Sequence, residues 1–155
     1  MAWSNSKVFG VLLEDLLKNT AAFALASDTL KVALYNNSIT PDQTVTAANS
    51  AYNAGQWATA QEVYESGQWA QGGVSLASVT VTRSSATTTL DAADTASGSA
   101  ADLANVHGCL IYDDTLTTPV ADQGICYVYF GGGSSVVNGT LTVQWNASGI
   151  ATFAA

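Results

Sequence analysis

The sequence predicts a mainly β (α+β) fold, a single β-sandwich or barrel-like domain that carries one amphipathic helix near its N-terminus. The chain has 155 residues, which suits one domain with a substantial hydrophobic core. One early segment has helical spacing, and the rest consists of short β-branched and aromatic runs separated by turn residues. We therefore assign residues 1–155 to one domain, with a helix or arm over 1–20 and a β-rich core over 29–155.

The helix is expected over residues 5–19, with Ser4 or Asn5 capping its start and Asn19 ending it. Its apolar positions follow the spacing of one helical face: Phe9, Leu12, Leu13 and Leu16. Its charged positions fall on the opposite side: Glu14, Asp15 and Lys18. Two placements stay open. The helix either covers one face of the chain's own sheet or forms an arm that docks on a neighbouring subunit, with Trp3 as its anchor.

The next elements are a strand over 29–35 and an Asn- and Pro-containing turn over 36–42. Residues 44–55 are Ala- and Asn-rich, and we expect a short helix or a loop across the sheet. The tetrapeptide Gly-Gln-Trp-Ala occurs at 55–58 and again at 67–70. Two copies are too few for a solenoid, so we interpret them as equivalent hairpin ends or loop contacts.

Short strands are expected through the second half of the chain. Residues 73–83 alternate apolar and small polar residues, so we expect a strand or a strand broken by a bulge near Ala77, and residues 87–92 form another strand. We interpret the glycine run at 131–133 as a bend followed by a break. Two closing strands, over 140–145 and 150–153, are then expected to pair through the turn at 146–149.

The centre of the predicted fold is an antiparallel hairpin formed by residues 106–112 and 124–130. We predict a register in which Cys109 faces Cys126, so that Leu110 faces Ile125 and Val106 faces Tyr129. One sheet face then carries Cys109, Ile111, Cys126, Val128 and Phe130. The other carries Val106, Leu110, Tyr112, Ile125, Tyr127 and Tyr129. Because both faces are apolar, the hairpin should be covered on both sides.

Composition limits the partners that this chain can bind. Hydrophobic residues make up 48% and charged residues only 10%, with a net charge of −8 and four cations. The chain has no basic cluster, so we expect no nucleic-acid partner and no binding to an anionic membrane. Its acidic character fits a partner with a basic or neutral surface. Residues 1–7 lack the apolar core of a secretory signal, so we expect synthesis in a host cytoplasm.

Residues with catalytic or metal-binding chemistry are few, and we predict no catalytic, cofactor or metal site. His107 is the one histidine, and no fixed geometry joins it to a nucleophile. With Cys109 and Cys126 it supplies at most three zinc ligands. The carboxylates gather at Asp91, Asp94 and Asp102 and again at Asp113, Asp114 and Asp122, which we interpret as solvated turn residues without a calcium loop. The two cysteines are interpreted as buried thiols, with a cross-strand disulfide as the alternative.

Aromatic residues leave two interpretations open. Four Trp and six Tyr residues could line a sugar-binding platform around Trp57 and Trp69, or they could belong to the core and to an interface. We predict a set of interface residues: Trp3, Phe9, Leu13, Trp57 and Trp69.

Several segments of the chain carry a family resemblance. They are Met-Ala-Trp-Ser at 1–4, Leu-Lys-Val-Ala-Leu-Tyr at 30–35, Leu-Asp-Ala-Ala-Asp at 90–94, Gly-Cys-Leu-Ile-Tyr-Asp-Asp at 108–114, Val-Tyr-Phe-Gly-Gly at 128–132 and Val-Gln-Trp-Asn-Ala-Ser-Gly-Ile at 143–150. In these segments the sequence resembles small virion structural proteins of tailed bacteriophages, especially those of actinobacterial hosts.

The resemblance implies a non-enzymatic virion component. The leading hypothesis is a capsid decoration (head accessory) protein that binds the surface of the assembled shell and stabilises it. Its partners would be the major capsid protein and copies of itself in a homo-oligomer, for which a trimer is one arrangement. The alternative is a minor tail or fibre component that binds a host-surface glycan.

Overall fold

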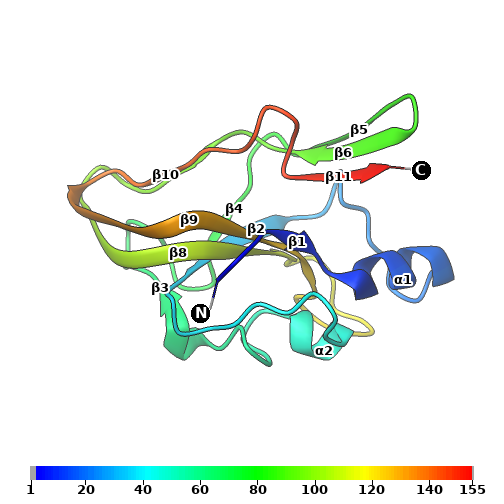
Figure 1. The fold of residues 1–155 in the computed structure, drawn as a ribbon, viewed down its shortest axis with the longest axis horizontal. Helices are drawn as coiled ribbons and strands as arrows, with labels where there is room; N and C mark the ends of the chain where they lie inside the picture. The colour runs from blue at the N-terminus through cyan, green and yellow to red at the C-terminus, as the bar shows by residue number, and fades with distance from the viewer. Residues whose placement is uncertain (1–2, 155) are drawn as a thin grey trace.

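In the computed structural model, which describes residues 3–154, two long strands form the hairpin around which the domain is built (Figure 1). These strands are β8 (Ala101–Asp113) and β9 (Gly124–Gly139). Both have buried apolar residues on their two faces along the half nearest the connecting loop, as the sequence predicts. The fold class is confirmed: the protein is mostly β, with antiparallel sheets packed together and one substantial helix near the N-terminus.

Short strands extend this hairpin into a six-stranded antiparallel sheet. Its order is β1 (Lys7–Val8), β9, β8, β2 (Leu30–Tyr35) and β3 (Glu62–Val63), with β4 (Val74–Ser75) also paired to β2. Strand β2 pairs with β8 along its whole length, which places its apolar residues in the middle of the sheet. The predicted strand over 29–35 is therefore confirmed, and its position explains why every residue but one in it is buried.

The register of the central hairpin differs from the prediction by two residues. Cys126 lies opposite Ile111, and Cys109 lies opposite Val128. A shift of two keeps the predicted faces because side chains alternate with a period of two. Two residues nevertheless lie on the face opposite to the predicted one, because the pairing of β8 with β9 contains irregularities. Val106 and Ile125 pack on the same side of the sheet as Cys109. The two cysteines are buried free thiols.

One face of the central sheet is covered by the second half of the chain. A three-stranded sheet contains β5 (Thr80–Ser84), β6 (Thr87–Asp91) and β11 (Ala151–Ala154), and a two-stranded sheet pairs β7 (Thr95–Ala96) with β10 (Thr142–Val143). Figure 1 shows both above the central sheet. The two closing strands are thus real, but the prediction that they pair with each other is wrong, because each finds an earlier strand instead.

The opposite face is covered by the segment between β2 and β3, which includes helix α2 (Ala47–Ser50) and a 3-10 turn at Thr59–Gln61 (Figure 1). The Thr46 side chain caps α2 by accepting a hydrogen bond from the Asn49 N–H. The short helix predicted within 44–55 is confirmed. The central sheet therefore lies between two apolar layers.

Helix α1 (Gly10–Lys18) is shorter than the predicted helix. Residues 7–9 are extended because β1 pairs with β9 and the Phe9 N–H donates to the Ile125 carbonyl over 3.1 Å. Neither Ser4 nor Asn5 caps the helix, and Gly10 begins it. Asn19 ends it as predicted, in a left-handed conformation with φ of 54°.

Two further expectations, about residues 73–83 and about the glycine run, differ from the structure. The prediction of a single strand over 73–83, with or without a bulge near Ala77, is wrong. Strand β4 ends at Ser75 in the central sheet, Ser78 has a positive φ of 54°, and β5 begins at Thr80 in a different sheet. The predicted break after the glycine run is also wrong. Strand β9 continues to Gly139 because β8 supplies pairing partners back to Ala101, with shifts of register along the way.

Candidate docking surface

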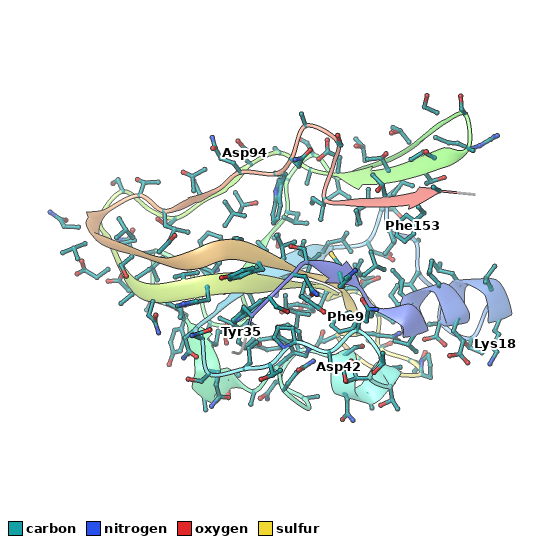
Figure 2. All side chains as sticks on the ribbon, viewed as in Figure 1. Phe9, Lys18, Tyr35, Asp42, Asp94 and Phe153 are labelled. Atoms are coloured by element: carbon teal, nitrogen blue, oxygen red, sulfur yellow. The ribbon has the colours of Figure 1, made fainter. Side chains whose placement is uncertain are left out.

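An open apolar groove lies between helix α1 and the β5–β6–β11 sheet. Both elements extend on the same side of the molecule, and Figure 2 shows Lys18 on α1 and Phe153 on β11 at the two sides. The groove has a volume of about 590 Å³. It is lined by Leu13, Leu16, Leu17, Phe23, Ala24, Leu25, Ala26, Ser27, Val81, Thr88 and Phe153. We call this feature the docking groove.

Helix α1 supplies one wall because only part of its apolar stripe is covered by the domain. Leu12 points into the core and is fully buried. Leu13 and Leu16 are 43% and 42% exposed, and Leu17 is 88% exposed. Large apolar residues gathered on one exposed surface are a usual mark of a protein contact site. Of the predicted helical face, Phe9 and Leu12 are buried in the chain's own core, whereas Leu13 and Leu16 are not covered by it.

The β5–β6–β11 sheet supplies the opposite wall. Register places Phe153 beside Thr88 on neighbouring strands, and Val81 lies on β5 at the edge of the same sheet. Phe153 is half-buried against the core, whereas Val81 is 40% exposed. The wall is thus firmly packed at its centre and open at its β5 edge.

The segment between α1 and β2 lines one end of the groove, and hydrogen bonds to two acidic residues hold it in place. Asp15 is buried and accepts hydrogen bonds from the Thr20 hydroxyl and, over 2.8 Å, from the Gln123 side-chain amide. Its predicted place on the solvent side of the helix is therefore wrong. Asp28 accepts from the Ala24 N–H over 2.6 Å and holds a tight turn. These contacts set the shape of the groove before any partner binds.

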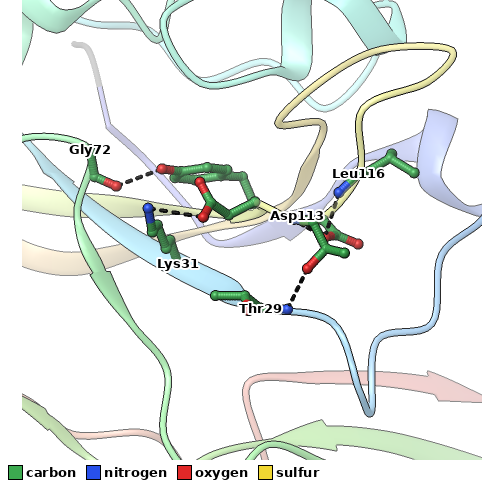
Figure 3. Close-up of polar contacts among 8 residues, drawn as sticks. Thr29, Lys31, Gly72, Asp113 and Leu116 are labelled. Atoms are coloured by element: carbon green, nitrogen blue, oxygen red, sulfur yellow. Dashed lines mark hydrogen bonds and ion pairs between the residues drawn. The ribbon is translucent and has the colours of Figure 1, made fainter.

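Asp113 lies beneath this turn with its side chain completely buried. One carboxyl oxygen accepts from the N–H groups of Thr115 and Leu116, at 2.9 and 3.1 Å, and the other is buried without a partner. Burial, reinforced by the nearby carboxyl of Asp28, raises the pKa of Asp113 to about 6. Figure 3 shows this region, including the bond from the Thr29 N–H to the Thr115 hydroxyl.

Asp114 and Asp122, which the sequence analysis grouped with Asp113, are less buried than Asp113. Asp114 is partly exposed and forms an ion pair with Lys31 at 3.0 Å (Figure 3). The Asp122 N–H donates to the Leu116 carbonyl in the same loop, and partial burial raises the pKa of its carboxyl. The interpretation of all these carboxylates as solvated turn residues is therefore wrong for Asp113, which caps the loop from inside the domain.

Four of the five predicted interface residues lie in the interior of this chain. Phe9, Trp57 and Trp69 have no exposed surface and Trp3 has 2%, so none of them offers its side chain to a partner. The correction has a simple physical reason, since large aromatic side chains contribute most stability when the domain's own core encloses them. Leu13 alone of the five lines an open surface, and its interface role stays a prediction.

Three of these aromatics form one cluster beneath the central sheet. Trp57 packs edge-on against Trp3 at 5.9 Å and against Phe9 at 6.1 Å between ring centroids. Trp69 belongs to the core on the other face, so the two Gly-Gln-Trp-Ala copies are not equivalent contacts. Since both tryptophans are enclosed, the suggested sugar platform around Trp57 and Trp69 is wrong.

The remaining chemically capable residues lie apart from one another. His107 is on β8, where its Nδ1 lies 3.1 Å from the Asn105 carbonyl. Burial raises the pKa values of the Cys109 and Cys126 thiols, the latter to about 12. Among residues 3–154, no group of three or more His, Cys, Asp or Glu residues is arranged to hold a metal ion. No helix in this part of the chain is long and apolar enough to span a membrane.

Comparison with known proteins adds no relative: no protein-family model, no curated protein and no solved structure matches this chain. The docking groove is therefore identified from its own geometry. Sequence reasoning predicted Leu13 as an interface residue but did not predict that Leu17, Val81 and Phe153 line the groove, the first two exposed and the third half-buried. The available signal was the width of the apolar stripe, because Leu16 and Leu17 extend it beyond what one sheet contact buries.

Proposed function

We propose that this chain is a non-enzymatic virion structural protein of a tailed bacteriophage, a capsid decoration protein that docks on the assembled shell. The observation that carries the proposal is the docking groove, an exposed apolar surface with walls from two separate elements. Three exposed leucines on one short helix are costly to leave in water and are stabilised by burial against a partner. The resemblance of the sequence to phage virion proteins supports the choice of partner.

The proposed partners are the major capsid protein and further copies of this chain. With a net charge of −8, the protein favours a shell surface that is neutral or basic where it docks. Its location would be the capsid surface, reached after synthesis in the host cytoplasm. Docking many copies through one apolar site stabilises the shell because binding favours the assembled form.

The direct test adds the purified protein to phage heads that lack it, sediments the heads and counts the bound copies. We expect saturation at a multiple of the shell's symmetry-related sites and a higher melting temperature of the decorated shell. Leu17→Asp should bind at least about tenfold more weakly, because a carboxylate would enter an apolar contact. Its side chain is 88% exposed in the free chain, so the fold itself should be unaffected.

Val137→Asp is the matched control. Val137 is 83% exposed and lies near the end of β9, which Figure 1 places on the opposite side of the molecule from α1. This variant adds the same charge at a position of nearly the same exposure, and we expect it to bind heads like the unchanged protein. Retention on isolated tails or on host cell wall, with no binding to heads, would overturn the decoration proposal and favour the minor tail alternative.

A further inference from the structure

Strand β5 forms an open edge beside the docking groove. In the order β11–β6–β5, only β6 pairs with it, and all five residues of Thr80–Ser84 are exposed. An edge strand presents unpaired N–H and C=O groups, which makes it a template for another strand. Within residues 3–154, no other segment covers this edge through strand pairing.

The backbone geometry of the hairpin shows which groups face outward. Strands β5 and β6 are joined by Ser85 and Ala86 alone, so Ser84 and Thr87 form the closing pair. Hydrogen-bonded and non-hydrogen-bonded pairs then alternate along the ladder. Val81 and Arg83 consequently direct their N–H and C=O groups away from β6, towards the open edge.

This edge has few of the features that normally prevent strand addition. Protected edges usually contain proline, lysine, a bulge or a covering loop. Strand β5 has no proline, one cation and an unbroken register with β6 over its whole length. Thr80, Val81 and Thr82 are also β-branched residues that favour the extended conformation.

The open edge and the docking groove meet at Val81, whose side chain lines the groove while its backbone faces outward. A strand added to β5 would lie about 4.8 Å away and would extend the groove wall. Alternate side chains of that strand would point to the groove side of the sheet, towards the exposed leucines of α1. Backbone pairing and apolar burial would therefore stabilise the same complex.

We propose that β5 accepts a strand from a partner protein, an extended segment that alternates apolar with small polar residues and has basic flanks. The charge of the chain argues for this occupant. It has 12 acidic and four basic residues, and two of the basic residues, Lys18 and Lys31, form ion pairs. A basic segment is attracted to such a chain, whereas pairing this edge with the same edge of a second copy would bring together two chains of −8 and two Arg83 side chains. Contacts between copies in the proposed oligomer would therefore use another surface, and the basic residues of the segment would lie in its flanks, away from Arg83. The inference rests on the proposed docking role of the groove but can be tested without phage heads.

The test uses a blocked synthetic peptide that alternates valine and threonine between terminal lysines. We expect it to bind the full chain and to protect the Val81 and Arg83 amides from hydrogen exchange measured by NMR. Arg83→Pro removes an outward N–H without breaking the β5–β6 ladder, and Arg83→Ala removes only the charged side chain. The proline variant should bind at least about tenfold more weakly than the alanine variant.

A second probe guards against misfolding of the proline variant. The same peptide with N-methylated valines cannot donate to β5, and it should bind the unchanged protein about tenfold more weakly than the parent peptide. Equal affinity for the two peptides, binding without protection of the Val81 and Arg83 amides, or no binding at millimolar peptide would overturn the proposal. Protection of those amides by dimerisation of the chain alone would also overturn it, by assigning β5 to a second copy. Peptide binding without head binding would leave strand addition standing and refute decoration.

Discussion

Replacing Asp113 by asparagine should change how the stability of this protein depends on pH. The carboxyl is buried, one oxygen has no partner, and its pKa is about 6 against an ordinary 3.8. In the unfolded chain the group ionises from about pH 4, but in the folded chain it resists ionisation until about pH 6. The unfolded state therefore binds fewer protons in this interval, and stability falls as pH rises through it.

The pKa change sets the size of the effect. A rise from 3.8 to about 6 corresponds to about 2 kcal/mol of unfolding free energy lost between pH 4 and pH 7, because the carboxyl of the unfolded chain is already more than half ionised at pH 4. Asp113→Asn cannot ionise, and its amide oxygen still accepts from the N–H groups of Thr115 and Leu116. Its NH₂ group can donate to the Asp28 carboxylate, whose closeness to the Asp113 carboxyl is one cause of the raised pKa. The variant should therefore be more stable than the unchanged protein at neutral pH.

Urea unfolding followed by tryptophan fluorescence, at a series of pH values, measures this difference. We expect the gap between variant and unchanged protein to widen by about 2 kcal/mol from pH 4 to pH 7. Asp114→Asn, at the partly exposed neighbour that pairs with Lys31, controls for the loss of one negative charge. Parallel pH curves for Asp113→Asn and the unchanged protein would refute the reasoning.

Three further predictions concern packing and exposure. Gly108→Ala should destabilise the fold by about 1–3 kcal/mol, because its new methyl group would lie 2.6 Å from the Trp3 ring; thermal unfolding measures this, and an unchanged melting temperature would contradict it. Leu17→Asp should change the free energy of unfolding, measured with urea, by less than about 0.5 kcal/mol, since its side chain is 88% exposed; a large loss of stability would show that the leucine is packed in solution. Cys109 and Cys126 should react with a thiol reagent only after unfolding, because both are buried, and rapid labelling of the folded chain would disprove this placement.

Sequence patterns identified the faces of the central hairpin more reliably than its register. Apolar residues on both sides of 106–112 and 124–130 predicted that both faces of the hairpin are covered, and in the structure an apolar layer packs on each face. The two-residue shift was invisible to that pattern because a period of two is unchanged by it. Long-range contacts select the register, including Gly108, which leaves room for the Trp3 ring on the strand.

At the candidate docking surface, too, the sequence predicted which residues share a face but not whether that face is covered. Helical spacing showed that Leu13 and Leu16 lie on one side of a helix, but spacing does not say whether the rest of the domain covers that side. The structure leaves both about 40% exposed because α1 lies beyond the end of the central sheet (Figure 1). In the same way, composition showed large aromatics at 57 and 69, and only the packed fold determined that both are interior.

The sequence by itself determined the mainly β class, the strand over 29–35, the short helix within 44–55 and the acidic, charge-poor character of the surface. These properties are local or compositional, so neighbouring residues contain the information. The tertiary structure decided the strand partners of β10 and β11, the burial of Asp113 and the exposure of the α1 leucines. Each depends on contacts between residues far apart in the chain, and hydrophobic periodicity does not encode which distant segment supplies them.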